Sequence, residues 1–92
     1  MAIVVKFEVT GMDADRYDRI IAELERIGQG APDGRLSHVC YGDRASLQVI
    51  DVFESPAKLE AFGAKLMPTL QALGVTAKPN VIEAHNFIPG RP

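Results

Sequence analysis

His38 and Asp51 are the two side chains of this 92-residue sequence whose types and spacing could do chemistry together. Each lies inside a short segment rich in β-forming residues, 36–41 and 47–53. The residues between these segments, 42–46, make a loop of a length typical of a β-hairpin. A hairpin would bring the two side chains close to one another, and an aspartate beside a histidine can orient the imidazole and raise its basicity. The pair is therefore our candidate for a general base.

The register of this hairpin decides whether His38 and Asp51 meet. If the numbers of paired residues sum to 89, the two residues are directly opposite. If they sum to 88, a slip of one residue puts the two side chains on opposite faces of the sheet. The five-residue loop pairs Tyr41 with Leu47 and gives 88, and a loop shorter by one residue gives 89. Both registers stay open. So does a structural interpretation, in which the residues form a polar pair on the sheet surface or at a dimer contact.

His85 and Asn86 are the next candidates, near the end of the last predicted strand, where they point to opposite faces. Either could hydrogen-bond a ligand, and a histidine in such a place is also common as a hydrogen-bonded interface residue. The chain has two histidines, on separate predicted strands, without a third group at metal-ligand spacing. We therefore expect no metal site.

Cys40, Tyr17 and Tyr41 each have a functional and a structural interpretation. Strand alternation puts Cys40 on the face of His38, but a thiol becomes a nucleophile only with an activating base and a lowered pKa. A buried structural thiol is the alternative. The two tyrosines could line a pocket and offer a hydroxyl group to a ligand, or pack at the edge of the core.

The segments that must position these residues begin with a strand and an amphipathic helix. Apolar residues occupy every second position from residue 3 to residue 9, which is the period of a strand with one buried face. Asp13 or Asp15 can cap the helix that follows. Its apolar residues recur at spacings of three and four, and Gly28 is a suitable end. This stripe consists of Tyr17, Ile20, Ile21, Leu24 and Ile27.

A second helix is predicted to begin with Ser55 as its N-cap and Pro56 at its first position. Pro68 lies inside this helix, where it removes a backbone hydrogen bond, so we expect a kink or a break near Leu66. The last strand is expected over residues 81–88, after an extended lead-in that contains a proline. The buried stripe of the helix consists of Leu59, Phe62, Leu66, Leu70 and Leu73.

The resulting order of strand, helix, strand, strand, helix and strand is the ferredoxin-like βαββαβ plan. We expect a single α+β domain over residues 1–92, with a four-stranded antiparallel sheet and two helices on one face. A domain of this size buries a modest core, and this plan leaves one sheet face uncovered. Pairing into a homodimer is a usual remedy.

Composition restricts the partners and the location. The formal net charge is −2, and the ten cationic residues are spread along the chain without a basic patch, so no nucleic-acid partner is expected. No apolar stretch reaches membrane-spanning length, and the alternating start does not resemble a signal peptide. A single cysteine excludes an internal disulfide and suggests a reducing compartment. We therefore expect a cytoplasmic protein without membrane contact.

Three junctions of the chain carry a resemblance to a known family. They are the strand-to-helix junction of residues 51–56, Phe62 and Leu66 ahead of residues 67–68, and the closing residues 83–86. With the order of elements, they resemble the dimeric α/β-barrel superfamily, which includes the antibiotic-biosynthesis monooxygenase-like domains and the stress-responsive barrel proteins. The resemblance implies a dimer whose two sheets face one another as a barrel. It also implies a pocket in each subunit between the sheet and its helices.

The activities in this superfamily include cofactor-free oxygenation of polycyclic phenols, haem degradation, isomerisation and dehydration. Haem-degrading members rely on a tryptophan, which this chain lacks, and Phe53 stands at the junction where many relatives carry one. The resemblance therefore argues against haem degradation, and we expect no cofactor.

Three classes of function follow. In the first, the protein is a cofactor-independent monooxygenase-like enzyme, or a related isomerase or cyclase, acting on an aromatic or polyketide-like substrate. His38, backed by Asp51, would remove a proton, and the carbanion would react with oxygen or rearrange. The resemblance and the pattern together assign substrate contacts to Tyr17, Tyr41, Phe53, His85 and Asn86. In the second class, the protein is a non-catalytic dimer that binds a small hydrophobic ligand or acts in a stress response. The third class, an RNA-recognition module, needs exposed aromatic and basic residues on the sheet, and residues 47–53 do not offer them.

Overall fold

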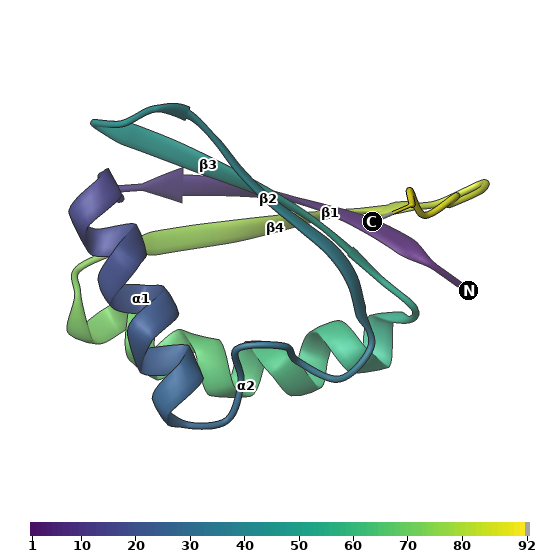
Figure 1. Ribbon diagram of the computed structural model, residues 1–92, viewed down its shortest axis with the longest axis horizontal. Coiled ribbons are helices and arrows are strands. Elements are labelled where there is room, and N and C mark those ends of the chain that lie inside the picture. Colours follow the sequence, from purple (N-terminus) through teal and green to yellow (C-terminus); the bar gives the residue numbers. More distant parts are fainter. Residues whose placement is uncertain (92) are drawn as a thin grey trace.

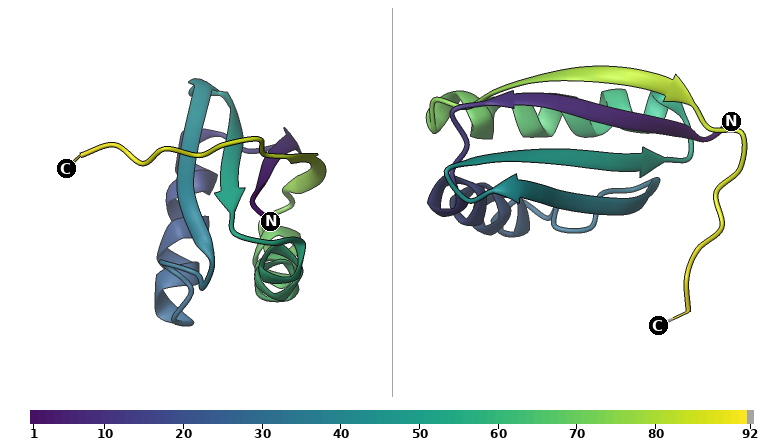
Figure 2. Two further views of the ribbon diagram at one scale, coloured as in Figure 1. Left: turned by 90° about the vertical axis from the view of Figure 1, so that its right-hand side faces the viewer. Right: turned by 90° about the horizontal axis from the view of Figure 1, so that it is seen from above.

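The computed structural model describes residues 1–91 and has the predicted βαββαβ order. Four antiparallel strands form one sheet in the order β2-β3-β1-β4, and both helices lie against the same face of it (Figure 1). Seen from above, the opposite face of the sheet carries no helix (Figure 2). The elements are β1 (Ile3–Thr10), α1 (Ala14–Arg26), β2 (Arg35–Asp43), β3 (Ser46–Phe53), α2 (Pro56–Ala72) and β4 (Thr76–Glu83).

The hairpin of β2 and β3 is tighter than the five-residue loop expected from the sequence. Asp43 pairs with Ser46, which leaves the two-residue turn Arg44–Ala45. The Asp43 carboxylate accepts a hydrogen bond from the Ala45 amide at 2.8 Å and so closes the turn. Paired residues therefore sum to 89, and His38 stands directly opposite Asp51.

A β-bulge interrupts β2 near its start. Arg35 pairs with Phe53 and Ser37 pairs with Val52, so Leu36 is an extra residue in the ladder. In a regular strand, residues 35 and 38 would face opposite sides of the sheet. The bulge puts Arg35 on the helix-covered face with His38 and leaves the Leu36 side chain 44% exposed.

The last strand begins and ends earlier than the expected 81–88. β4 runs from Thr76 to Glu83 along the edge of the sheet, and it includes Pro79. The Ala84 amide bonds to the Ala2 carbonyl at 3.0 Å, so the nitrogens of even-numbered residues face β1 and the nitrogen of Pro79 faces the free edge. An edge strand accepts proline in that position because no ladder bond is lost.

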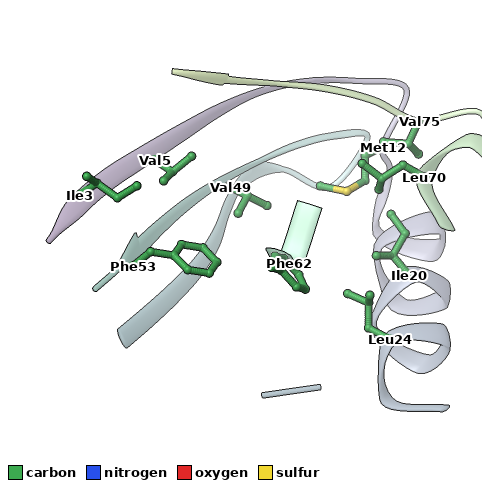
Figure 3. Packing of buried hydrophobic residues seen from close by; sticks show 10 residues of the cluster. All are labelled: Ile3, Val5, Met12, Ile20, Leu24, Val49, Phe53, Phe62, Leu70 and Val75. Carbon is green, nitrogen blue, oxygen red and sulfur yellow. The ribbon is translucent and has the colours of Figure 1, made fainter. Parts of the chain in front are cut away.

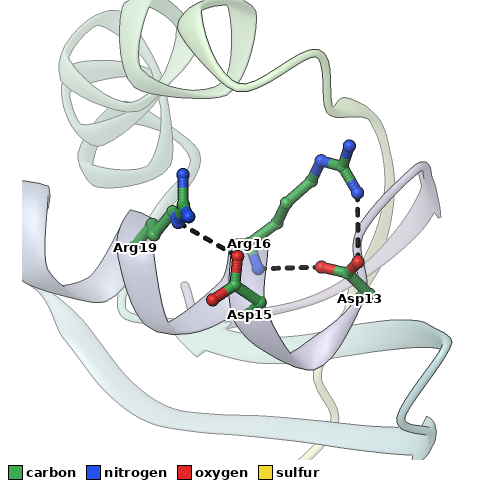
Figure 4. Close-up of polar contacts among 4 residues, drawn as sticks. All are labelled: Asp13, Asp15, Arg16 and Arg19. Carbon is green, nitrogen blue, oxygen red and sulfur yellow. Dashed lines mark hydrogen bonds and ion pairs between the residues drawn. The ribbon is translucent and has the colours of Figure 1, made fainter.

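The N-terminus of α1 is fixed by a cap (Figure 4). Of the two candidates, Asp13 is the N-cap, and its carboxylate accepts from the Arg16 amide at 2.8 Å and from the Arg16 side chain at 3.1 Å. Asp15 pairs instead with Arg19 at 3.0 Å. The cap sets the start of the first turn and thereby the direction in which Tyr17 projects.

The second helix begins as predicted, with Ser55 as its N-cap and Pro56 at its first position. It does not break near Leu66, and α2 continues as one helix to Ala72 with Pro68 inside it. Pro68 and Ala64, whose carbonyl would otherwise bond residue 68, are both exposed, so water can hydrate that carbonyl.

The core lies between the sheet and the two helices (Figure 3). Phe53 is fully buried there, with its ring centroid 5.9 Å from that of Phe62 on α2. The buried apolar side chains are Ile3, Val5, Met12, Ile20, Leu24, Val49, Phe53, Phe62, Leu70 and Val75. Within residues 1–91, no helix is long and apolar enough to cross a membrane.

The uncovered face of the sheet is partly apolar. On β2 it presents Val39, which is 54% exposed, and Tyr41, two positions along. Val39 pairs with Ile50 on β3, and Ile82 of β4 is exposed on the same face. Exposed apolar side chains that cluster on one face are a feature of interaction surfaces.

Candidate active site

His38, Asp51 and Tyr17 form a hydrogen-bonded chain between the sheet and α1. The Nδ1 atom of His38 lies 2.6 Å from Oδ1 of Asp51, and its Nε2 atom lies 2.7 Å from the hydroxyl oxygen of Tyr17. The rings of Tyr17 and His38 are nearly parallel, with centroids 6.0 Å apart. The structure thus brings together both proposed catalytic residues and one of the proposed substrate-binding residues.

The carboxylate of Asp51 determines which nitrogen of His38 carries the proton. Asp51 is 2% exposed, and an ionised carboxylate can only accept hydrogen bonds. Nδ1 of His38 therefore donates to Asp51, and in a neutral imidazole Nε2 is then the acceptor for the Tyr17 hydroxyl. This is the tautomer that a general base acting through Nε2 requires.

Burial raises the pKa of the Tyr17 phenol above its ordinary value of 10.0, and the nearby Cys40 adds to the effect. Tyr17 therefore remains a protonated hydroxyl at neutral pH. Burial also raises the pKa of the Cys40 thiol, so Cys40 is not an activated nucleophile. Of its two interpretations, the structural thiol fits these surroundings.

A cavity of about 50 Å³ lies beside the hydrogen-bonded residues Tyr17, His38 and Asp51, between the sheet and the helices. His38, Asp51 and Tyr17 contribute to its wall, and Arg35 is its other polar side chain. The rest of the wall is apolar and comes from both helices, from β1, β3 and β4, and from the loop residues Met12 and Val75. These residues include Phe7, Val9, Ile20, Val49, Phe62, Leu66 and Leu70.

Arg35 was not among the residues predicted from the sequence. Its guanidinium lies over the ring of Phe62, 5.7 Å from the centroid, and donates one hydrogen bond to the Gly30 carbonyl at 3.3 Å. The sequence carries no signal for this position. Alternation counted from His38 puts Arg35 on the other face, and only the bulge at Leu36 reverses that assignment.

The other predicted ligand contacts lie outside the cavity wall. Tyr41 is on the uncovered face of the sheet, and Phe53 is buried in the core against Phe62. His85 and Asn86 follow the end of β4 in an exposed segment, so they do not occupy the last strand as expected. Among residues 1–91, no three His, Cys, Asp or Glu side chains are grouped as metal ligands would be.

Solved structures with the same architecture include oxygenases. A cofactor-independent oxygenase from Streptomyces nogalater, SnoaB, superposes with a TM-score of 0.60 at 19% identity, over 97% of this chain and 96% of that chain. A protein of Deinococcus radiodurans provisionally named as an antibiotic biosynthesis monooxygenase has a TM-score of 0.63 at 14% identity, over the whole of both chains. No family model and no curated protein sequence matches the chain.

A third similar structure shows that likeness in fold does not by itself indicate a shared activity. It is a de novo designed protein with a ferredoxin fold, with a TM-score of 0.55 at 14% identity, over 98% of this chain and 92% of that chain. The chain therefore has the ferredoxin-like fold of the antibiotic biosynthesis monooxygenase-like proteins. Its chemistry has to be argued from its own site, because fold alone does not define function.

Proposed function

We propose that this protein is a cofactor-independent monooxygenase that acts on an acidic aromatic or polyketide-like ring compound. The observation that carries the proposal is the Asp51–His38 pair, which orients an imidazole in the wall of an apolar cavity, with its Nε2 atom bonded to the Tyr17 hydroxyl. An apolar cavity with a few convergent polar groups is the usual form of a small-molecule site. The shared architecture with SnoaB supports the choice of oxygen chemistry.

In the proposed reaction, His38 accepts a proton at Nε2 from an activated CH₂ group of the substrate, while Asp51 stabilises the imidazolium that forms. The carbanion then gives its electrons to O₂ and a C–O bond forms. Return of the proton yields a hydroperoxide, and loss of water from it leaves a carbonyl group. The sum is CH₂ + O₂ → C=O + H₂O, which balances without an added reductant.

Tyr17 has to move for this reaction to begin. Its hydroxyl occupies Nε2 of His38, and the cavity of about 50 Å³ is smaller than the roughly 150 Å³ cavity that admits benzene in another protein. We therefore propose that the substrate enters as the Tyr17 side chain rotates away. A substrate hydroxyl or an acidic C–H group then takes the place of the phenol beside Nε2.

We further propose that the working unit is a homodimer formed through the uncovered face of the sheet. The exposed Val39, Tyr41 and Ile82 on this face would then be covered by a second copy. The Val39→Asp variant should be monomeric while the wild type is dimeric, as measured by light scattering after gel filtration. A monomeric wild type would refute this part of the proposal. The single free cysteine leads us to propose a cytoplasmic location as well.

Oxygen consumption tests the enzymatic proposal. The wild type is incubated with a panel of one- to three-ring phenols and enolisable ketones, and oxygen uptake is recorded with His38→Asn as the matched variant. Uptake by the wild type that falls by at least about 100-fold in the variant supports the base assignment. If some panel members bind but none is oxidised, the protein is the non-catalytic ligand-binding dimer instead.

A further inference from the structure

We propose that Arg35 binds a carboxylate of the ligand, so that the site takes ring compounds with a carboxylate at one end and an acidic hydroxyl or C–H group at the other. This inference deepens the proposed function, because it assigns a substrate class to the same cavity. It begins from the bulge in β2, whose extra residue directs Arg35 toward the helices and into the cavity wall. Bulges commonly redirect a side chain next to a binding site.

The surroundings of Arg35 leave most of its donors free for a ligand. A guanidinium has five N–H donors, and within residues 1–91 one of them has a partner, the Gly30 carbonyl. The ion pairs within residues 1–91 involve Arg16, Arg19, Arg26, His38 and Lys58. None of them involves Arg35, although it is half-buried.

The position of the guanidinium is also fixed in advance. It lies on the face of Phe62, which is buried in the core, and it is also held by its hydrogen bond to the Gly30 carbonyl. A planar guanidinium held in this way matches the two oxygens of a carboxylate. The neighbouring cavity wall is largely apolar, and an apolar surrounding strengthens the interaction of a guanidinium with an anion.

The two polar groups in the cavity wall differ in charge. Asp51 neutralises the charge that His38 acquires on taking a proton. No carboxylate of the described chain forms an ion pair with Arg35. A ligand with one fixed negative charge and one removable proton matches both Arg35 and His38, and a neutral phenol matches only His38.

Calorimetric titration with two matched ligands tests the inference. 4-Hydroxybenzoate and 4-hydroxybenzamide have nearly the same shape and differ by the negative charge of the carboxylate. The wild type should bind the benzoate about 10- to 100-fold more tightly, the range expected for hydrogen bonds to a charged group. Arg35→Gln should bring this ratio close to one, and Arg35→Lys should leave an intermediate ratio because lysine keeps the charge but not the fork.

Arg44→Gln is the control, because it removes the same charge from the exposed turn of the hairpin, outside the cavity wall. It should keep the wild-type ratio. A wild-type ratio near one, an unchanged ratio in Arg35→Gln, or no binding of the benzoate would overturn the inference. Thermal melting of each variant shows that it is folded before titration. Binding does not depend on oxygen, so these outcomes are separate from a failure of the oxygenase proposal, which would appear as absent oxygen uptake.

Discussion

Two substitutions of His38 should differ sharply in their effect on stability. Asp51 is 2% exposed, and within residues 1–91 the one side chain that hydrogen-bonds to it is His38. His38→Ala leaves this carboxylate buried without its hydrogen-bond donor, and an unsatisfied buried charged group costs about 3 kcal/mol or more. His38→Asn keeps an N–H donor at nearly the position of Nδ1, so it should lose only the contact with Tyr17, about 0.5–1.5 kcal/mol.

Urea denaturation and thermal melting measure this difference. For a domain of this size, about 1 kcal/mol shifts the melting temperature by about 4–8 °C, so His38→Ala should melt at least about 12 °C below the wild type. Replacing the orphaned carboxylate as well, in His38→Ala/Asp51→Leu, should recover most of the loss because no buried charge remains. Equal losses in His38→Ala and His38→Asn would refute the reasoning, since the buried charge would then not depend on the histidine. The same comparison identifies His38→Asn as the variant for activity assays.

Three further predictions follow from particular contacts. Because the Tyr17 phenol has a raised pKa, the folded state holds its proton more tightly than the unfolded state, so stability should fall as pH rises above about 10. In Tyr41→Phe, Tyr17 is the remaining tyrosine, and its tyrosinate absorbance should appear above pH 10.0; a midpoint at or below that value would contradict its burial. Pro68→Ala restores a helix hydrogen bond to the exposed Ala64 carbonyl and should stabilise the protein by up to about 3 kcal/mol, as measured by urea denaturation. A loss of stability would mean that the packing of α2 depends on the proline. In the same helix, the methyl group of Gly63→Ala meets no atom within 4 Å, so this variant should raise the free energy of unfolding by about 1 kcal/mol. A destabilised variant would mean that the methyl group does not fit at that position.

Local patterns in the sequence were sufficient for the order of the elements. Alternation located β1, and the spacing of apolar residues with an aspartate or serine cap located both helices. Local rules failed where tertiary context decides. Pro79 suggested a lead-in before the last strand, but it is accommodated at a sheet edge where its missing N–H faces no partner. Pro68 suggested a kink or a break, and the helix does not break, because α2 is held by its packing against the sheet on both sides of the proline.

The sequence indicated which residues could form the candidate site, but not that they would lie close together. The types of His38 and Asp51 suggested the chemistry, but their meeting depends on a two-residue turn, Arg44–Ala45, that lacks glycine and has no residue at positive φ. Such a turn has no signature comparable to the Asn-Gly pair of common hairpins. Arg35 was unpredictable for a stronger reason, because the alternation of β2 favoured Leu36 on the inner face.

Because of the bulge, the charge of the cavity wall depends on the register of β2 as well as on the residues that the sequence contains. If Leu36 were drawn into the ladder opposite Phe53, a leucine would replace the arginine in the wall, and the same sequence would favour an uncharged ligand. Insertions or deletions in the loop before β2 could bring about such a slip, while His38 and Asp51 would remain paired from the hairpin end. Ligand preference in proteins of this architecture could therefore diverge through changes in loop length, with the base and its carboxylate left in place.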